Sequence, residues 1–120
     1  MLTPQEQERY TRQIMMPEIG ETGQERLKNS RVLVIGAGGL GSPAAYYLAA
    51  AGVGTIGIAD GDRVEPSNLQ RQILHQESRL GQNKADSAAQ TLHGLNSHVD
   101  VKAYPCFLDV PALVEAINQI

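Results

Sequence analysis

The stretch Val32–Ser42 constrains the fold of this chain more than any other feature of its sequence. Four apolar residues run directly into a turn with the pattern G-x-G-x-x-G, whose glycines are Gly36, Gly38 and Gly41. An alanine-rich segment that favours a helix follows the turn. A buried strand, a glycine turn and a helix in this order are typical of nucleotide-binding α/β domains, although the pattern alone does not say which nucleotide is bound.

The three glycines have different physical uses in such a turn. Gly36 makes the tight turn out of the strand, and Gly38 lets backbone approach a phosphate or a ribose without a side chain in the way. Gly41 lets the new helix pack closely on the strand. The helix N-terminus then offers free N–H groups and a partial positive charge, which favour an anion.

Composition limits the chain to one small globular domain. It has 120 residues, of which 42% are hydrophobic and 19% charged, and its formal net charge is −3. This charge gives no electrostatic reason to bind nucleic acid or an anionic membrane, and no apolar run is long enough to span one. The polar first residues do not resemble a signal peptide, so we expect a cytoplasmic protein. Cys106 is the only cysteine, which excludes an internal disulfide and a cysteine-pair zinc site within these residues, and we expect it to be partly buried.

Strands and helices alternate along the chain after a helical N-terminal extension. The extension begins at Thr3, which with Glu6 predicts a capping box for a helix over 4–14. The expected elements after it are a short helix over 24–29, a strand over 31–35, a helix from Ser42 that Gly52 ends, a strand over 55–59, short helical turns over 66–74, a helix over 84–95, a strand over 99–103 and a helix capped by Asp109. This order predicts an α/β fold, a Rossmann-like parallel sheet with helices on both faces. Residues 1–120 would then form a single nucleotide-binding domain.

Asp60 directly follows the second expected strand. At that position an acidic side chain can accept hydrogen bonds from ribose hydroxyls, and the glycine turn upstream favours this interpretation over a simple turn residue. Asp62 is as well explained by a turn as by a ligand contact.

Two basic residues follow, Arg71 within the segment Ser67–Gln72 and Lys84 at the start of an expected helix. Either residue on its own would be interpreted as a solvent-facing side chain. Loops at the carboxyl ends of parallel strands line the ligand crevice, however, and a guanidinium fork suits two phosphate oxygens. Together with Asp60, the two residues are predicted to contact phosphates.

Arg9 and Arg12 lie three residues apart in the expected N-terminal helix, so they would share one face. Two guanidinium groups near a triphosphate could stabilise charge that develops in a transition state. A solvated helix face is the alternative interpretation.

Several motifs together resemble the ThiF/MoeB/HesA family, bacterial relatives of ubiquitin-activating enzymes. The resemblance is carried by Arg9–Ile14, Gly36–Gly41, Ala51–Gly54, Asp60–Asp62 and Ser67–Gln72, and it runs from about Glu8 to Asn96. This joint pattern is far more specific than the glycine turn alone.

The resemblance implies a reaction. Members of the family bind ATP with Mg²⁺ and adenylate the C-terminal glycine carboxylate of a small ubiquitin-like sulfur-carrier protein, ThiS-like or MoaD-like, in thiamin or molybdopterin synthesis. By matching motif, Gly39 and its neighbours would approach the nucleotide, and Asp60 would hold the ribose. Asn68, Arg71 and Lys84 would contact the phosphates.

The resemblance also implies a homodimer in which Arg12 reaches the active site of the other subunit, so that Arg12, Arg71 and Lys84 are the candidate catalytic residues. The attacking carboxylate is already ionised, so no general base is needed. We therefore expect His75, His93 and His98 to be surface or helix-packing residues.

Members of the family are considerably longer than this chain. Their magnesium-binding aspartate, the structural zinc of many members and the surface that grips the carrier match nothing in residues 1–120. We therefore hypothesise that the chain is the N-terminal part of a longer enzyme, in which case the strand over 31–35 would have an unpaired apolar edge. The alternatives are an NAD-binding oxidoreductase domain, suggested by the glycine turn and Asp60 alone, and a non-catalytic nucleotide-binding fragment.

Overall fold

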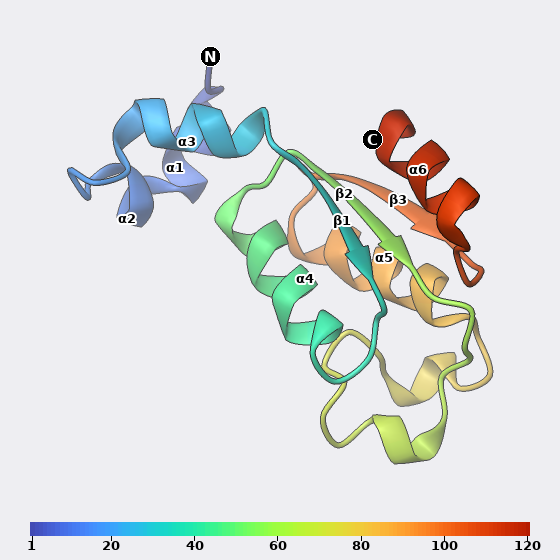
Figure 1. The fold of residues 1–120 in the computed structure, drawn as a ribbon. Coiled ribbons are helices and arrows are strands. Elements are labelled where there is room, and N and C mark those ends of the chain that lie inside the picture. Colours follow the sequence, from blue (N-terminus) through green and yellow to red (C-terminus); the bar gives the residue numbers. More distant parts are fainter.

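A computed structural model describes residues 1–120 as a three-stranded parallel sheet preceded by three short helices (Figure 1). The elements are α1 (Pro4–Arg9), α2 (Thr11–Ile14), α3 (Gly20–Lys28), β1 (Arg31–Ile35), α4 (Gly41–Ala51), β2 (Thr55–Ala59), the 3-10 turns Pro66–Asn68 and Glu77–Arg79, α5 (Lys84–Leu95), β3 (Asp100–Tyr104) and α6 (Val110–Gln119). The strands pair in the order β1-β2-β3, with Arg31 opposite Thr55 and Thr55 opposite Asp100. The predicted α/β, Rossmann-like fold is confirmed.

Helices cover both faces of the sheet, and the side chains of β2 show how. Successive side chains of a strand point to opposite faces. Ile56 and Ile58 are fully buried in a core that also contains residues of α4 and α5. Gly57 faces the other way, where a Cβ would meet the side chain of Ile120 at the end of α6. Strand β1 pairs only with β2, so its other edge is unpaired, and Ile35 at its end is exposed.

The N-terminal capping box is present as predicted. The Glu6 carboxylate accepts a hydrogen bond from the Thr3 N–H at 3.0 Å, while the Thr3 hydroxyl accepts one from the Glu6 N–H at 3.1 Å. Lys28 also pairs with the Glu6 carboxylate at 2.9 Å. Burial alone would raise the pKa of Glu6, but these hydrogen bonds from Lys28 and Thr3 outweigh it and lower the pKa.

The prediction of one continuous helix over 4–14 is wrong. The helix breaks at Tyr10, whose backbone leaves the helical region at φ −101° and ψ 17°. The break buries the Tyr10 ring against Gly52, and its hydroxyl accepts a hydrogen bond from the Asn96 amide at 2.7 Å. Arg9 and Arg12 therefore belong to different helices and do not share a face.

Helices α1 to α3 pack at the end of the sheet opposite the glycine turn (Figure 1). The amides of Gln13 and Gln24 both donate to the Ala51 carbonyl at 2.9 Å, at the last residue of α4. Because α4 begins at the glycine turn and runs back along the sheet, its last residue marks the opposite end.

Several element boundaries differ from the predictions by one to four residues. Strand β3 begins one residue later than expected, and α3 begins four residues earlier. Helix α4 begins at Gly41, and Ser42 does not cap it, because the buried Ser42 hydroxyl accepts a hydrogen bond from the Leu74 N–H at 2.7 Å instead. Gly52 ends α4 in a left-handed conformation, as predicted, and Asp109 caps α6. None of the helices combines the length and the apolar character that crossing a bilayer requires.

Candidate nucleotide-binding site

The glycine turn has the geometry that its sequence predicts. Gly36 adopts a φ of +96°, a conformation that side chains disfavour. A Cβ at Gly41 would overlap the carbonyl of Gly36, so the first turn of α4 lies directly on the end of β1. No side chain caps α4. The Ser42 N–H donates to the Gly38 carbonyl at 2.8 Å, whereas the Gly41 N–H has no partner within the chain and is free for an anion.

Asp60 lies where β2 ends, and two backbone groups fix its carboxylate. Its Oδ2 accepts a hydrogen bond from the Ala37 N–H at 2.8 Å, and its Oδ1 accepts one from the Asp62 N–H at 2.8 Å. Asp60 is nearly buried, at 9% exposure. Each carboxylate oxygen can accept a further hydrogen bond, so the group can hold the glycine turn and still accept from a ligand.

Lys84 is the first residue of α5 and is only 7% exposed. No hydrogen bond or ion pair within the chain engages its ammonium group. The residue lines a hollow of about 270 Å³ together with Asn68 and Asp62. Asn68 uses its Oδ1 to accept from the Glu65 N–H at 2.9 Å, so its amide nitrogen is free to donate. An almost buried ammonium without a partner is costly unless an anion joins it.

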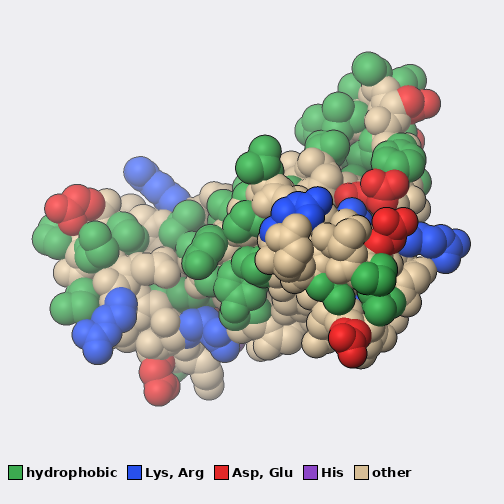
Figure 2. Space-filling model, turned by 90° about the horizontal axis from the view of Figure 1, so that it is seen from below, with side chains coloured by type: hydrophobic (Ala, Val, Ile, Leu, Met, Phe, Trp, Pro, Cys, Tyr) green, Lys and Arg blue, Asp and Glu red, His purple; other side chains and the backbone are tan.

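Arg71 runs along the glycine turn. A Cβ at Gly39 would lie 3.7 Å from its Nε, and its Nη1 donates to the Ser67 carbonyl at 3.0 Å. The side chain is exposed and retains free donors. Figure 2 views the molecule from this end and shows basic and acidic side chains next to each other over the loops that follow the strands.

A second hollow, of about 350 Å³, is lined by Asp60 and Asp62. Its walls are mostly apolar and include Ile35, Ala59 and Phe107. Cys106 also lines it and is exposed, so the prediction of a partly buried cysteine is wrong. The reason is that residues 105–109 form an irregular segment outside the sheet.

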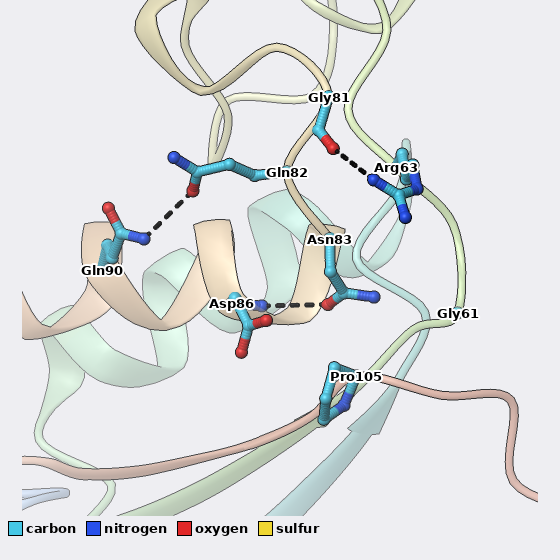
Figure 3. A pocket seen from close by; sticks show the side chains of 8 residues that line it. All are labelled: Gly61, Arg63, Gly81, Gln82, Asn83, Asp86, Gln90 and Pro105. Carbon is cyan, nitrogen blue, oxygen red and sulfur yellow. Dashed lines mark hydrogen bonds between the residues drawn. The ribbon is translucent and has the colours of Figure 1, made fainter.

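Sequence reasoning missed Asn83. Its Nδ2 donates to the Asp60 carbonyl at 2.8 Å, while its Oδ1 accepts from the Ala85 N–H at 2.7 Å and thereby caps α5. An asparagine before a helix is a capping signal, and it was available from the sequence, but the contact with Asp60 was not. Asn83 also borders a polar hollow of about 530 Å³ that no predicted site residue lines (Figure 3).

The model of the ThiF family matches residues 10–120, a range that includes the glycine turn, Asp60, Arg71 and Lys84. The chain belongs to the ThiF family.

Three relatives illustrate the similarity. The chain is 58% identical over 106 residues to the adenylyltransferase and sulfurtransferase UBA4 of Vanderwaltozyma polyspora, covering 88% of this chain and 24% of that protein. It is 48% identical over 118 residues to the probable adenylyltransferase/sulfurtransferase MoeZ of Mycobacterium tuberculosis, covering 98% and 30%. The crystal structure of E. coli MccB with ATP superimposes with a TM-score of 0.72 at 32% identity, covering 78% of this chain and 28% of that one. The chain thus spans a quarter to a third of the length of these relatives.

In this ThiF-family chain, His75 is not a surface residue but is buried against Ser87 of α5, which is the helix-packing alternative of the prediction. It is 6% exposed, and its Nε2 and Nδ1 lie 2.7 Å from the Ala37 carbonyl and 2.9 Å from the Ser87 hydroxyl. Burial lowers the pKa of His75, and the hydrogen bond with Ala37 only partly opposes this. His93 and His98 are exposed, as predicted.

Arg12 is not brought together with the other predicted residues. It is exposed on α2, at the end of the sheet opposite the glycine turn (Figure 1). The structure also contains no group of three or more His, Cys, Asp or Glu side chains that could hold a metal ion. The residues present therefore do not fit a resident metal.

Proposed function

We propose that this chain is the nucleotide-binding part of an enzyme that uses ATP to adenylate the C-terminal glycine carboxylate of a small ubiquitin-like sulfur-carrier protein, ThiS-like or MoaD-like, in thiamin or molybdopterin synthesis. The observation that carries the proposal is the unpaired ammonium of the nearly buried Lys84, in a hollow shared with Asn68 and Asp62. The names of the adenylyltransferase relatives and the MccB structure with ATP support it.

Three neighbouring features suit the three parts of ATP. The apolar hollow beside Asp60 suits a flat base, and its volume of about 350 Å³ is ample for one. The fixed carboxylate of Asp60 suits the ribose hydroxyls. The open N-terminus of α4, with Arg71 alongside and Lys84 and Asn68 beyond, suits the phosphates.

The reaction brings two anions together. A carboxylate oxygen of the carrier attacks the α-phosphorus of ATP, and the bond from that phosphorus to the bridging oxygen of the β-phosphate breaks. The electron pair leaves with pyrophosphate, and an acyl-adenylate is formed. Arg71 and Lys84 would reduce the repulsion between the anions and stabilise the departing charge. Mg²⁺ would enter with the nucleotide as MgATP, and no step here depends on a metal held by these residues.

We propose that the enzyme is a homodimer in which Arg12 acts on the nucleotide of the other subunit. Two observations support this. Arg12 lies on α2, at the end of the sheet opposite the glycine turn of its own chain (Figure 1). Helix α4 carries no charged residue, and Tyr47 and Leu40 on and beside it are exposed, which is unusual for a solvent-facing helix. Figure 2 shows hydrophobic side chains between the N-terminal helices and the charged side chains over the loops that follow the strands.

We also propose that the chain is the N-terminal part of a longer enzyme. The unpaired edge of β1 and the coverage of only a quarter to a third of the relatives support this. An intact-mass measurement of the natural protein and the reading frame downstream of the Ile120 codon test it. A stop codon directly after that codon would contradict it.

The two alternatives are tested by binding and by exchange. An NAD-binding oxidoreductase has no evident use for an ammonium beside a triphosphate, so the chain should bind ATP in preference to NAD. Exchange of labelled pyrophosphate into ATP, driven by a sulfur-carrier protein, would rule out the alternative that the chain only binds nucleotide without catalysis. Preference for NAD, or absence of exchange in the full-length protein, would overturn the proposal.

The variant Arg71→Ala tests the site directly. One charge-assisted hydrogen bond contributes about 1.5–3 kcal/mol, so ATP binding should weaken by roughly 10- to 100-fold. Arg26→Ala removes the same charge from the exposed surface of α3 and should leave binding unchanged. Equal affinities in the two variants would show that Arg71 lies outside the site.

A further inference from the structure

In the glycine turn, side chains contact both the N–H and the carbonyl of Ala37. Its N–H donates to Asp60 Oδ2 at 2.8 Å, and its carbonyl lies 2.7 Å from His75 Nε2. Ala37 is fully buried, so these two contacts determine how its backbone is oriented. The ring of His75 therefore acts on the same short backbone segment as the Asp60 carboxylate.

The hydrogen-bond partners of His75 fix its tautomer. A carbonyl oxygen only accepts, so Nε2 carries the proton and donates it to Ala37. Nδ1 then accepts from the Ser87 hydroxyl at 2.9 Å. Ser87 Oγ itself accepts from Arg79 Nη1 at 3.3 Å, which leaves the hydroxyl proton free to point at the ring.

The surroundings of the ring favour its neutral form. Besides burial, the positive charges of Lys84 and Arg79 face it and oppose protonation, whereas the negative charge of Asp60 favours it. The balance lowers the pKa of His75. A neutral ring in one tautomer, held at both nitrogens, is a rigid donor.

We propose that His75 is a positioning residue for ribose recognition: by holding the Ala37 carbonyl, it directs the Ala37 N–H at Asp60 and fixes the carboxylate that accepts from the ribose hydroxyls. This inference rests on the proposed ATP site. His75 itself touches no ligand. It acts through one backbone segment and one carboxylate, so its effect should be confined to the ribose.

The experiment compares ATP with 2′,3′-dideoxy-ATP, which lacks both ribose hydroxyls, in equilibrium binding to the full-length protein. Wild type should prefer ATP. His75→Phe fills the same space without a donor and should bind ATP about three- to tenfold more weakly, with unchanged affinity for the dideoxy analogue. His75→Gln retains a donor in place of Nε2 and should keep most of the preference. His93→Phe, at an exposed position of α5, is the matched control and should leave both affinities unchanged.

The outcomes separate this inference from the proposed function. Equal losses for ATP and the analogue in His75→Phe would mean a merely structural role, and an unchanged preference would mean no role; either overturns the inference alone. A wild type that binds no ATP overturns the proposed function and, with it, this inference. If circular dichroism shows that His75→Phe does not fold, Ser87→Ala is used instead. It removes the hydroxyl that donates to Nδ1, so the ring is no longer restricted to one tautomer, and the preference for ATP over the dideoxy analogue should fall. If Ser87→Ala prefers ATP as strongly as the wild type does, the inference is overturned.

Discussion

Replacing Lys84 by methionine should stabilise the free protein and weaken its binding of ATP. Methionine has nearly the same length and keeps an apolar stem, but it removes the ammonium group. Lys84 is only 7% exposed, and its ammonium has no hydrogen bond or ion pair within the chain. Removing an unpartnered charge from such a position should raise the free energy of unfolding by up to about 1 kcal/mol. That gain corresponds to a rise of about 4 °C in Tm for a domain of this size.

Binding should change in the opposite direction. If the Lys84 ammonium contacts a phosphate, its loss removes a charge-assisted hydrogen bond of about 1.5–3 kcal/mol. ATP should then bind roughly 10- to 100-fold more weakly, since each 1.4 kcal/mol is about a factor of ten. Adenosine has no phosphate, so its affinity should remain unchanged. The ratio of the two affinities therefore isolates the phosphate contact from any general change in the site.

Urea unfolding and isothermal titration calorimetry with ATP and adenosine test both claims. Lys102→Met is the matched control, because it removes the same charge from β3, where the ammonium donates to the Gln119 carbonyl at 3.1 Å outside the hollow. It should neither stabilise the chain nor change ATP binding. A Lys84→Met variant that is less stable than wild type and binds ATP as tightly would refute the reasoning.

Three further predictions concern the turn, the buried histidine and the N-terminal helices. Gly41→Ala should reduce the free energy of unfolding by about 3 kcal/mol through its overlap with the preceding turn, whereas Gly94→Ala, in open space on α5, should raise it by about 0.5–1 kcal/mol, both measured by urea unfolding. Because the folded chain lowers the pKa of His75, its neutral form contributes stability that is complete above the ordinary value of 6.5 and is lost as pH falls below it; unfolding at stepped pH should show this loss, and His75→Phe should reduce it. Arg12→Ala should reduce pyrophosphate exchange in the full-length protein while ATP binding by one chain stays unchanged, and mixed dimers with an Asp60→Asn subunit should show whether Arg12 acts across the interface.

The sheet and the helices beside it could be predicted because local signals define them. The bounds of β1, β2 and α5 agree with the predictions, since apolar runs, Gly52 and the residues before α5 mark these elements within a few positions. The break at Tyr10 could not be predicted in this way. It depends on the hydrogen bond with Asn96, a residue far away in the sequence.

The same distinction applies to the site. The glycine turn, Asp60 and Lys84 lie at the carboxyl end of the sheet because the order of strands and helices places them there. His75 could not be found from the sequence, because its partners Ala37 and Ser87 belong to two other segments that only the fold brings to it. Its neighbours in the sequence give no periodicity that would distinguish a buried ring from an exposed one.

The place of Arg12 restricts how the proposed enzyme can be assembled. A strand of five residues spans about 17 Å, and α1 to α3 lie at the far end of such strands from the glycine turn (Figure 1). Arg12 can therefore serve a triphosphate only if another copy presents its glycine turn to it. Helix α4 extends from the glycine turn to the N-terminal helices, among which α2 carries Arg12. If the α4 helices of two subunits pack antiparallel about a two-fold axis, each subunit presents its glycine turn to the Arg12 end of the other. The same contact would cover the uncharged outer face of α4, so one arrangement accounts both for a distant arginine and for a helix without a polar side.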